Sequence, residues 1–172
     1  MKKALQHLKK DPVMRTIIDQ VGPYTMEFRE PTFSTLVRSI VYQQLSGKVA
    51  SVILKRLIDA LPAGELTPQS ILRLRPERMR KLGLSRAKTE YIRDLARLTA
   101  KGEVVFETLL ELEDEAVIEN LTRVKGIGVW TAHMFLIFAL RRPDILATGD
   151  LGVRIAVQKA YQLQELPLPK QV

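Results

Sequence analysis

Apolar residues recur at helical spacing along most of this chain, and this periodicity is the strongest constraint on its fold. One stripe, at positions i, i+3, i+4, i+7 and i+8, consists of Phe33, Leu36, Val37, Ile40 and Val41. Similar stripes run through residues 49–57, 91–98 and 153–160. Prolines stand between the stripes, where helices begin and end. The sequence therefore predicts an all-α protein of about eight to ten short helices.

Composition limits the class of protein further. Hydrophobic residues make up 46% of the 172 residues, which is enough for the packed core of one domain. No apolar run reaches the ~20 residues that span a bilayer, and the basic start MKKALQHLKK has no apolar signal core. Without cysteine there are no disulfides, iron–sulfur clusters or thiolate zinc sites. We therefore expect a cytoplasmic protein, or one located wherever its partner is, with no membrane contact.

The charge balance favours a polyanionic partner. Lys and Arg together number 27 against 19 Asp and Glu, a net charge of +8. Residues 73–97 hold nine cations and three anions, whereas residues 103–119 hold seven acids and no base. A basic stretch of this kind is typical of a nucleic-acid-binding face, although a solvated helix face is an equally good interpretation of the charge alone.

Two glycines stand at the start of the most apolar predicted helix, in VKGIGVWTAHMFLIFAL (residues 124–140). Glycine weakens a helix interior by roughly 1 kcal/mol relative to alanine, so Gly126 and Gly128 indicate a tight turn before the helix. The free N–H groups of a helix start, preceded by a glycine turn, form an anion site. For a basic protein, the expected anion is a phosphate of a nucleic-acid backbone.

Four stretches together resemble the helix–hairpin–helix DNA-repair glycosylases, and in particular the type II 3-methyladenine DNA glycosylases. They are the hairpin L-x-x-V-x-G-I-G-x-x-T-A (residues 121–132), RRPDILATGDLGVR (141–154), LVRSIVYQQLSGKVA (36–50) and LGLSRAKTEYIRDLA (82–96). The resemblance implies an all-α fold with two helical subdomains flanking a DNA-binding cleft. It implies one glycosylase domain over residues 1–172: a smaller part at about 33–110, and the hairpin and catalytic aspartate at about 111–165, which pack with the N-terminal helices.

The resemblance also implies the reaction. Such enzymes flip a damaged base out of double-stranded DNA and break its N-glycosidic bond, and a carboxylate stabilises the oxocarbenium-like transition state. Asp150, twenty residues after Trp130, matches that carboxylate, and it is also a good N-cap for the helix that follows. Strand-nicking relatives carry a nucleophilic lysine where this chain has Trp130. We therefore expect a monofunctional enzyme that excises alkylated purines, chiefly 3-methyladenine, with no lyase step.

Further roles are carried over by the same resemblance. Trp130 is expected to stack on the flipped base, with Tyr42 and Gln43 near the base pocket, and either Leu45 or Ser46 is expected to fill the gap in the DNA. The expected phosphate ligands are the amides of Gly126, Gly128 and Thr131. The expected ligands of a structural Na⁺ or K⁺ ion are the carbonyls of Thr122, Val124 and Ile127. Catalysis is expected to need no metal or organic cofactor.

Two other functions remain open at this stage. A hairpin of this kind also occurs in non-catalytic DNA-binding modules, and a related glycosylase could act on another lesion, such as uracil or hypoxanthine. An assay for release of free base distinguishes a non-catalytic DNA-binding module, which releases none, from an enzyme. The identity of the released base shows on which lesion the enzyme acts. Nothing in the sequence suggests more than a monomer, and the expected compartment is the cytoplasm of a bacterium or the nucleus of a eukaryote.

Overall fold

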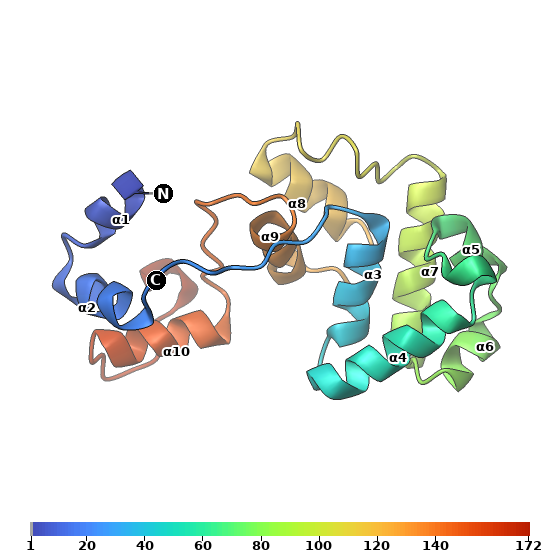
Figure 1. The fold of residues 1–172 in the computed structure, drawn as a ribbon, viewed down its shortest axis with the longest axis horizontal. Coiled ribbons are helices and arrows are strands. Elements are labelled where there is room, and N and C mark those ends of the chain that lie inside the picture. Colours follow the sequence, from blue (N-terminus) through green and yellow to red (C-terminus); the bar gives the residue numbers. More distant parts are fainter. Residues whose placement is uncertain (1) are drawn as a thin grey trace. The chain divides into compact units, whose positions relative to one another are not determined.

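The computed structural model describes residues 2–172, and within that range the chain forms ten α-helices, two short 3-10 helices and no strand (Figure 1). The helices of the first half are α1 (Lys2–Leu8), α2 (Pro12–Val21), α3 (Phe33–Tyr42), α4 (Gly47–Asp59), α5 (Pro68–Arg73) and α6 (Pro76–Lys81). Those of the second half are α7 (Arg86–Ala100), α8 (Asp114–Thr122), α9 (Val129–Phe138) and α10 (Leu151–Ala160). The 3-10 helices are η1 (Pro62–Gly64) and η2 (Pro169–Gln171). The all-α prediction is confirmed.

Short polar side chains start several of these helices. Thr32, Ser46, Ser85 and Asp150 precede α3, α4, α7 and α10, and each side chain accepts a hydrogen bond from a backbone N–H of the first turn. Such a cap satisfies one of the donors that a helix start leaves unpaired, and it typically contributes about 1 kcal/mol. The caps explain why each apolar stripe begins where it does.

The chain divides into two compact units: residues 28–146, and residues 1–27 together with 147–172. The resemblance instead implied a division into residues of about 33–110 and about 111–165. That division stays a prediction. No helix within residues 2–172 is long and apolar enough to cross a membrane.

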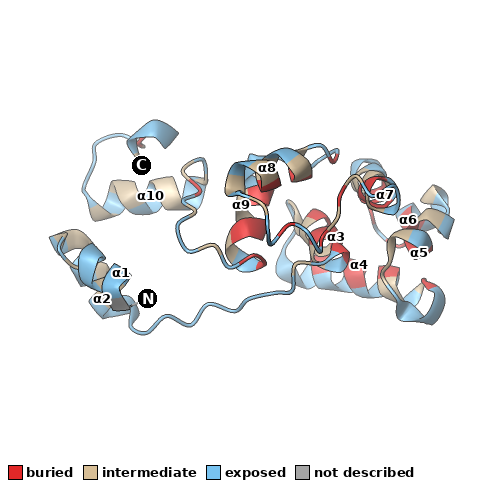
Figure 2. Cartoon of the chain, turned by 90° about the horizontal axis from the view of Figure 1, so that it is seen from above, coloured by how far each residue is buried: buried red, intermediate tan, exposed pale blue. Residues whose placement is uncertain are grey.

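The hydrophobic core lies in the unit of residues 28–146. Its long helix α7 packs against α3, α5 and α6, and α3 also packs against α4, while α8 pairs with α9. Figure 2 shows the buried residues on the inner faces of these helices. The predicted stripe of α3 is fully buried apart from a small part of Phe33, whose ring meets Phe106 edge to face at 6.4 Å between centroids. Helical periodicity therefore identified the core side of α3 correctly.

The other unit contains α1, α2, α10 and η2. Neither α2 nor α10 has a buried residue, and Ala147 and Pro167 are the buried residues of this unit within the described chain. The Asp11 carboxylate caps α2 by accepting a hydrogen bond from Met14 N at 2.8 Å, and Arg154 Nε donates to the carbonyl of Pro167 at 2.7 Å. Both contacts are polar and lie within this unit.

Candidate nucleic-acid interface and base pocket

The two glycines lie in the turn that joins α8 to α9. Ile127 N donates to the carbonyl of Val124 at 3.1 Å, and the side chains of Leu121, Val124 and Ile127 are buried between the helices. Gly128 is the N-cap of α9 and has an extended backbone. Because Gly128 brings no side chain to the cap, the first amides of α9 are left for an external acceptor. This is the hairpin that the sequence predicted.

Glycine is needed at positions 126 and 128 for different physical reasons. Gly126 has φ +77°, and a Cβ built there would lie 2.0 Å from the Tyr91 ring on α7. Only glycine fits this position, because the ring of Tyr91 occupies the space. Gly128 has an ordinary φ, and nothing lies within 4 Å of its would-be Cβ. The space before Gly128 is therefore open, as close approach of a phosphate requires.

The α8–α9 turn is also anchored by Asp94 on α7. Its carboxylate, 9% exposed, accepts a hydrogen bond from Lys125 N at 2.9 Å and forms an ion pair with Arg97 at 2.7 Å. Burial alone would raise the pKa of Asp94, but the hydrogen bonds from Lys125 and Arg97 and the charges of both residues outweigh it. The net effect holds the pKa of Asp94 below its ordinary value. Asp94 thus remains ionised and fixes the turn.

The loop between α3 and α4 carries the predicted DNA-inserting residues. Ser46 caps α4, since its hydroxyl accepts from Val49 N at 3.4 Å, whereas Leu45 is a 39% exposed apolar side chain. Gln44 beside it has φ +55°, a left-handed conformation that few non-glycine residues adopt. The loop therefore presents Leu45 and Gln44, and it uses Ser46 locally. Gln44 was not among the predicted residues, and no sequence pattern marked its conformation.

A cavity of about 410 Å³ brings the three predicted pocket residues together. Its walls are Arg29, Arg38, Ser39, Tyr42, Gln43, Trp130, Thr131, Met134 and Phe138. Trp130 is 49% exposed in the first turn of α9, and Arg38 stacks over the Tyr42 ring at 4.0 Å. A half-open cavity with three aromatic side chains and a few polar groups has the chemistry expected of a site for a planar heterocycle.

Helix α9 divides its side chains between the core and this cavity. Phe135 and Leu136 are buried in the core, whereas Trp130, Met134 and Phe138, four residues apart, face the cavity. Met134 and Phe138 were not predicted, because α9 is apolar on every side and its pattern does not distinguish the two faces. Spacing from Trp130 was the signal that could have found them.

Asp150 is the N-cap of α10, and its Oδ1 accepts from Val153 N at 2.9 Å. The capping role anticipated from the sequence is therefore present. Gly152 follows in the first turn, and a Cβ there would lie 2.9 Å from Asp150 Oδ1. Glycine at 152 thus leaves room for the Asp150 carboxylate in its capping position. Asp150 belongs to the unit of residues 1–27 and 147–172, and the cavity belongs to the other unit.

The carbonyls suggested for a monovalent cation lie at the end of α8 and in the turn after it. Carbonyl oxygens suit such an ion, and the Val124 carbonyl, which accepts from Ile127 N, still has a second lone pair. The donor set at Thr122, Val124 and Ile127 therefore fits the ion, which stays a prediction. Within residues 2–172, His, Cys, Asp and Glu form no group of three or more that could hold a metal.

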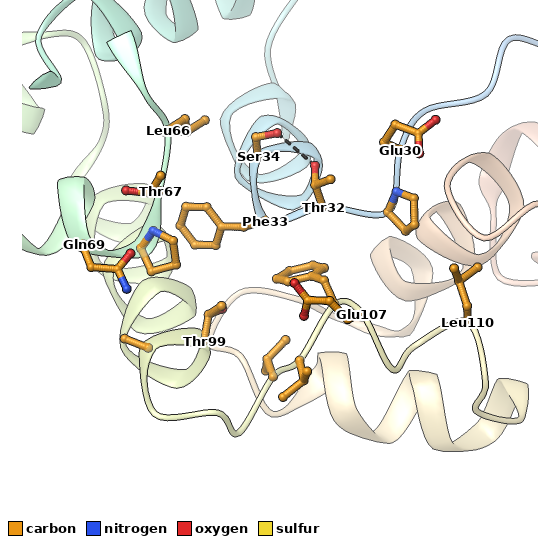
Figure 3. A pocket seen from close by; sticks show the side chains of 16 residues that line it. Glu30, Thr32, Phe33, Ser34, Leu66, Thr67, Gln69, Thr99, Glu107 and Leu110 are labelled. Carbon is orange, nitrogen blue, oxygen red and sulfur yellow. Dashed lines mark hydrogen bonds between the residues drawn. The ribbon is translucent and has the colours of Figure 1, made fainter. Parts of the chain in front are cut away.

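A larger groove, of about 630 Å³, lies at the other end of α7, beside Thr99 and Ala100. Figure 3 shows its side chains, with Phe33 pointing into it and Glu30 and Glu107 at its margins. None of the predicted site residues lines this groove. The larger of these two cavities is therefore not the one beside the hairpin.

Several cations of residues 73–97 have partners inside the protein. Arg93 donates to the carbonyl of Leu74 at 2.8 Å, Lys88 donates to the α3–α4 loop, and Arg86 pairs with Glu90. Burial lowers the pKa of Lys88. The basic stretch thus combines structural cations with exposed ones, and its charge count overstates the positive face that is open to a polyanion.

Comparisons with known proteins agree on one family. The model of the HhH-GPD superfamily base excision DNA repair proteins matches residues 37–172. DNA-3-methyladenine glycosylase 1 of Schizosaccharomyces pombe is 34% identical over 163 residues, which are 91% of this chain and 71% of that protein. The DNA-3-methyladenine glycosylase of Saccharomyces cerevisiae is 35% identical, over 87% of this chain and 56% of its own length.

Solved structures agree with the sequence relatives. The S. pombe 3-methyladenine DNA glycosylase Mag1, in complex with abasic DNA, superposes with a TM-score of 0.84 at 34% identity, covering 98% of this chain and 84% of that one. A DNA-3-methyladenine glycosidase from Bacillus halodurans gives 0.85 at 36% identity, covering 95% and 76%. With its hairpin, its all-helical fold and these matches, the chain belongs to the HhH-GPD superfamily of base excision DNA repair proteins.

Proposed function

We propose that this protein is a DNA glycosylase that excises alkylated purines, chiefly 3-methyladenine, from double-stranded DNA. The observation that carries the proposal is the cavity beside the start of the hairpin helix α9, which Trp130 and Tyr42 both line. Relatives that match nearly the whole chain are named 3-methyladenine glycosylases, and one of them was solved with abasic DNA, the product of base removal.

The hairpin and the α3–α4 loop would contact different parts of the DNA. The amides of Gly126, Gly128 and Thr131 would hold one phosphate, which positions the DNA without reading its sequence. Leu45, the exposed apolar residue of the α3–α4 loop, would enter the gap that the flipped nucleotide leaves and replace part of its stacking. The flipped base would stack on Trp130, and a cationic alkylated purine gains additionally from the electron-rich indole face.

The chemistry then needs one carboxylate. As the N-glycosidic bond breaks, its electron pair leaves with the purine and the sugar becomes positively charged, and the Asp150 carboxylate stabilises this charge. Water adds to the sugar carbon and releases a proton, which leaves an abasic site. The indole of Trp130 is no nucleophile, so the reaction stops without cutting the strand.

The test is release of free base from methylated duplex DNA, with the strand examined before and after alkali. Asp150→Asn keeps the N-cap, because asparagine caps as well as aspartate does, and removes only the charge. We expect this variant to lose at least about 100-fold in rate. Gly152→Ala should also lose activity, since its Cβ displaces the carboxylate, with little net change in stability, because the helix propensity that alanine gains, about 1 kcal/mol, offsets the weakened cap.

The matched control is Asp144→Asn, which removes an exposed carboxylate six residues earlier. It should release base at the wild-type rate. Base release by Asp150→Asn at the wild-type rate would refute the role of Asp150. If the wild-type protein binds DNA but releases no base from any lesion, it is a non-catalytic DNA-binding module. Strand breaks before alkali treatment would contradict the monofunctional mechanism.

One feature of the cavity favours a second candidate, a glycosylase for a neutral lesion such as hypoxanthine. Arg29 and Arg38 both line the cavity, and a cationic base beside them would be repelled. Arg38 stacks on Tyr42, so part of its charge is directed at that ring. Rates on matched duplexes with 3-methyladenine and with hypoxanthine decide between the two, and faster release of hypoxanthine would favour the second.

A further inference from the structure

Lys88 makes two contacts that the proposed reaction does not use. Its Nζ donates to the carbonyl of Val41 at 2.8 Å and to that of Gln43 at 2.6 Å. Both carbonyls belong to the end of α3, where a helix leaves acceptors without backbone donors. A lysine from α7 thus ends α3 and sets the direction in which the chain enters the α3–α4 loop.

The loop that Lys88 holds has a conformation that needs support. Gln44, directly after Gln43, has φ +55°, and such a residue persists only where its surroundings determine it. Leu45, the exposed apolar residue, follows Gln44. The carbonyl of Gln43, one of the two acceptors of Lys88, therefore lies one residue before the strained position and two before Leu45, the residue that would enter DNA.

One face of α7 contacts both segments that would touch DNA. Lys88, Tyr91 and Asp94 are spaced three residues apart and so share a side of the helix. Lys88 holds the α3–α4 loop, Tyr91 fills the space under Gly126, and Asp94 accepts from Lys125 N. Gln43 joins the two segments directly, because its Nε2 donates to the carbonyl of Gly126 at 3.0 Å.

These contacts surround a second cavity, of about 470 Å³, whose lining includes Gln43, Gln44, Lys88, Tyr91 and Gly126. Trp130 and Thr131 line both this cavity and the base pocket. The loop is therefore not packed tightly against the core, and a cavity beneath it leaves space into which it could sink. Lys88 lines this cavity, and its two hydrogen bonds tie the end of α3 and the start of the loop to α7.

We propose that Lys88 is a positioning residue for DNA insertion, which holds the Gln43–Leu45 loop in the conformation that enters the duplex and in fixed register with the hairpin. The inference rests on the proposed function, because insertion of this loop is part of it. Lys88 touches neither the base nor the sugar in this scheme, and it acts through Gln43 and Leu45.

The variants separate positioning from folding. Lys88→Met keeps the length of the side chain and removes its donors, whereas Lys88→Arg keeps donors for both carbonyls. Lys55→Met is the matched control, since Lys55 on α4 is 76% exposed and pairs with Asp59 one turn away on the same helix. Thermal unfolding of all three proteins shows whether each one is folded at the assay temperature.

Two measurements then test the loop. The first is single-turnover release of 3-methyladenine, where we expect Lys88→Met to lose about tenfold or more and Lys88→Arg to recover most of it. The second is independent of the chemistry: the fluorescence gain of 2-aminopurine placed opposite an abasic-site analogue, which reports unstacking of the duplex. Lys88→Met should lose at least half of that gain, while its affinity for undamaged duplex stays within about twofold of wild type.

The outcomes distinguish this inference from the proposed function. If the wild-type protein unstacks the probe but releases no base, the proposed glycosylase activity is refuted. The fluorescence gain of Lys88→Met then still tests the positioning role of Lys88. A full fluorescence gain in Lys88→Met would overturn the positioning role even if wild type is an active enzyme. An equal loss of fluorescence, base release and affinity for undamaged DNA in Lys88→Met would overturn it too, because that pattern marks a general structural defect.

Discussion

Gly126 and Gly128 are two residues apart in the same turn, but a side chain would have no room at Gly126 and open space at Gly128. At Gly126 a side chain would enter the Tyr91 ring and would also have to adopt φ +77°. At Gly128 a side chain meets nothing within 4 Å and the backbone is extended. Gly126 therefore serves folding, whereas Gly128 leaves space in front of the α9 start.

Alanine at each position tests this difference. Gly126→Ala should lower the free energy of unfolding by about 2–4 kcal/mol, because it combines overpacking with a strained backbone. Gly128→Ala should cost about 1 kcal/mol or less, since it loses only a favourable cap residue, yet it should weaken binding to undamaged duplex. Urea unfolding and fluorescence anisotropy measure the two effects. Equal destabilisation by both substitutions would contradict the assignment.

At the scale of single elements, α7 shows how one helix serves two purposes. Its buried face, with Ile92 and Leu95, packs into the core, and the face with Lys88, Tyr91 and Asp94 holds the loops at the candidate interface. Three of its charged residues, Lys88, Arg93 and Asp94, contact the backbone of other elements. A charge count along the sequence assigns such residues to a solvated or DNA-binding face.

Asp94 provides a pH-dependent test of this element. Asp94→Asn should lower the free energy of unfolding by about 1–2 kcal/mol at pH 7, because a charged acceptor of two hydrogen bonds is lost. The folded-state pKa lies below the ordinary value of 3.8, so this contribution is fully present above that value and is lost as the pH falls through the folded-state pKa.

Urea unfolding of wild type and Asp94→Asn should therefore show a constant difference from pH 7 to about pH 5 and a shrinking one at more acidic pH. Asp59→Asn is the control, since Asp59 is 57% exposed and pairs with Lys55 on its own helix. A difference between wild type and Asp94→Asn that stays the same at all pH values would show that the charge of Asp94 does not act on the turn.

At the scale of the whole molecule, burial is distributed unequally between the two units. All residues of the hydrophobic core cluster lie between Phe33 and Leu140, in the unit of residues 28–146. The other unit contributes Ala147 and Pro167 as buried residues within the described chain, and α10 exposes Leu151. The unit that carries Asp150 thus has little apolar burial of its own.

Hydrogen exchange should reflect this inequality. Amides of α3, α7 and α9 should exchange slowly, at rates set by global unfolding, because their helices are anchored by buried side chains. Amides of α2 and α10 should exchange faster by local opening, and DNA with an abasic-site analogue should slow exchange in α10 if Asp150 acts there. Mass spectrometry of peptides from each helix measures the rates, and equal protection in all five helices would contradict the expectation.

The helical class, the α3 stripe, the hairpin and the Asp150 cap could be predicted from the sequence, because each depends on residues close together in the chain. Spacing of apolar residues selects a helix face, and a short polar residue before the stripe fixes where the helix begins. The family motifs in residues 121–154 are local in the same sense. These features needed no knowledge of which helices meet.

Tertiary structure decided the rest, because it depends on segments that are distant in the chain. Three features follow from how α3, α7 and α9 pack: Tyr91 makes Gly126 obligatory, Lys88 holds a loop more than forty residues earlier, and Met134 and Phe138 face the cavity beside Trp130. Helix α9 is apolar on all sides, so only its neighbours determine which side is core. Local sequence specifies each helix and its ends, whereas contacts between helices specify what each exposed or buried side chain does.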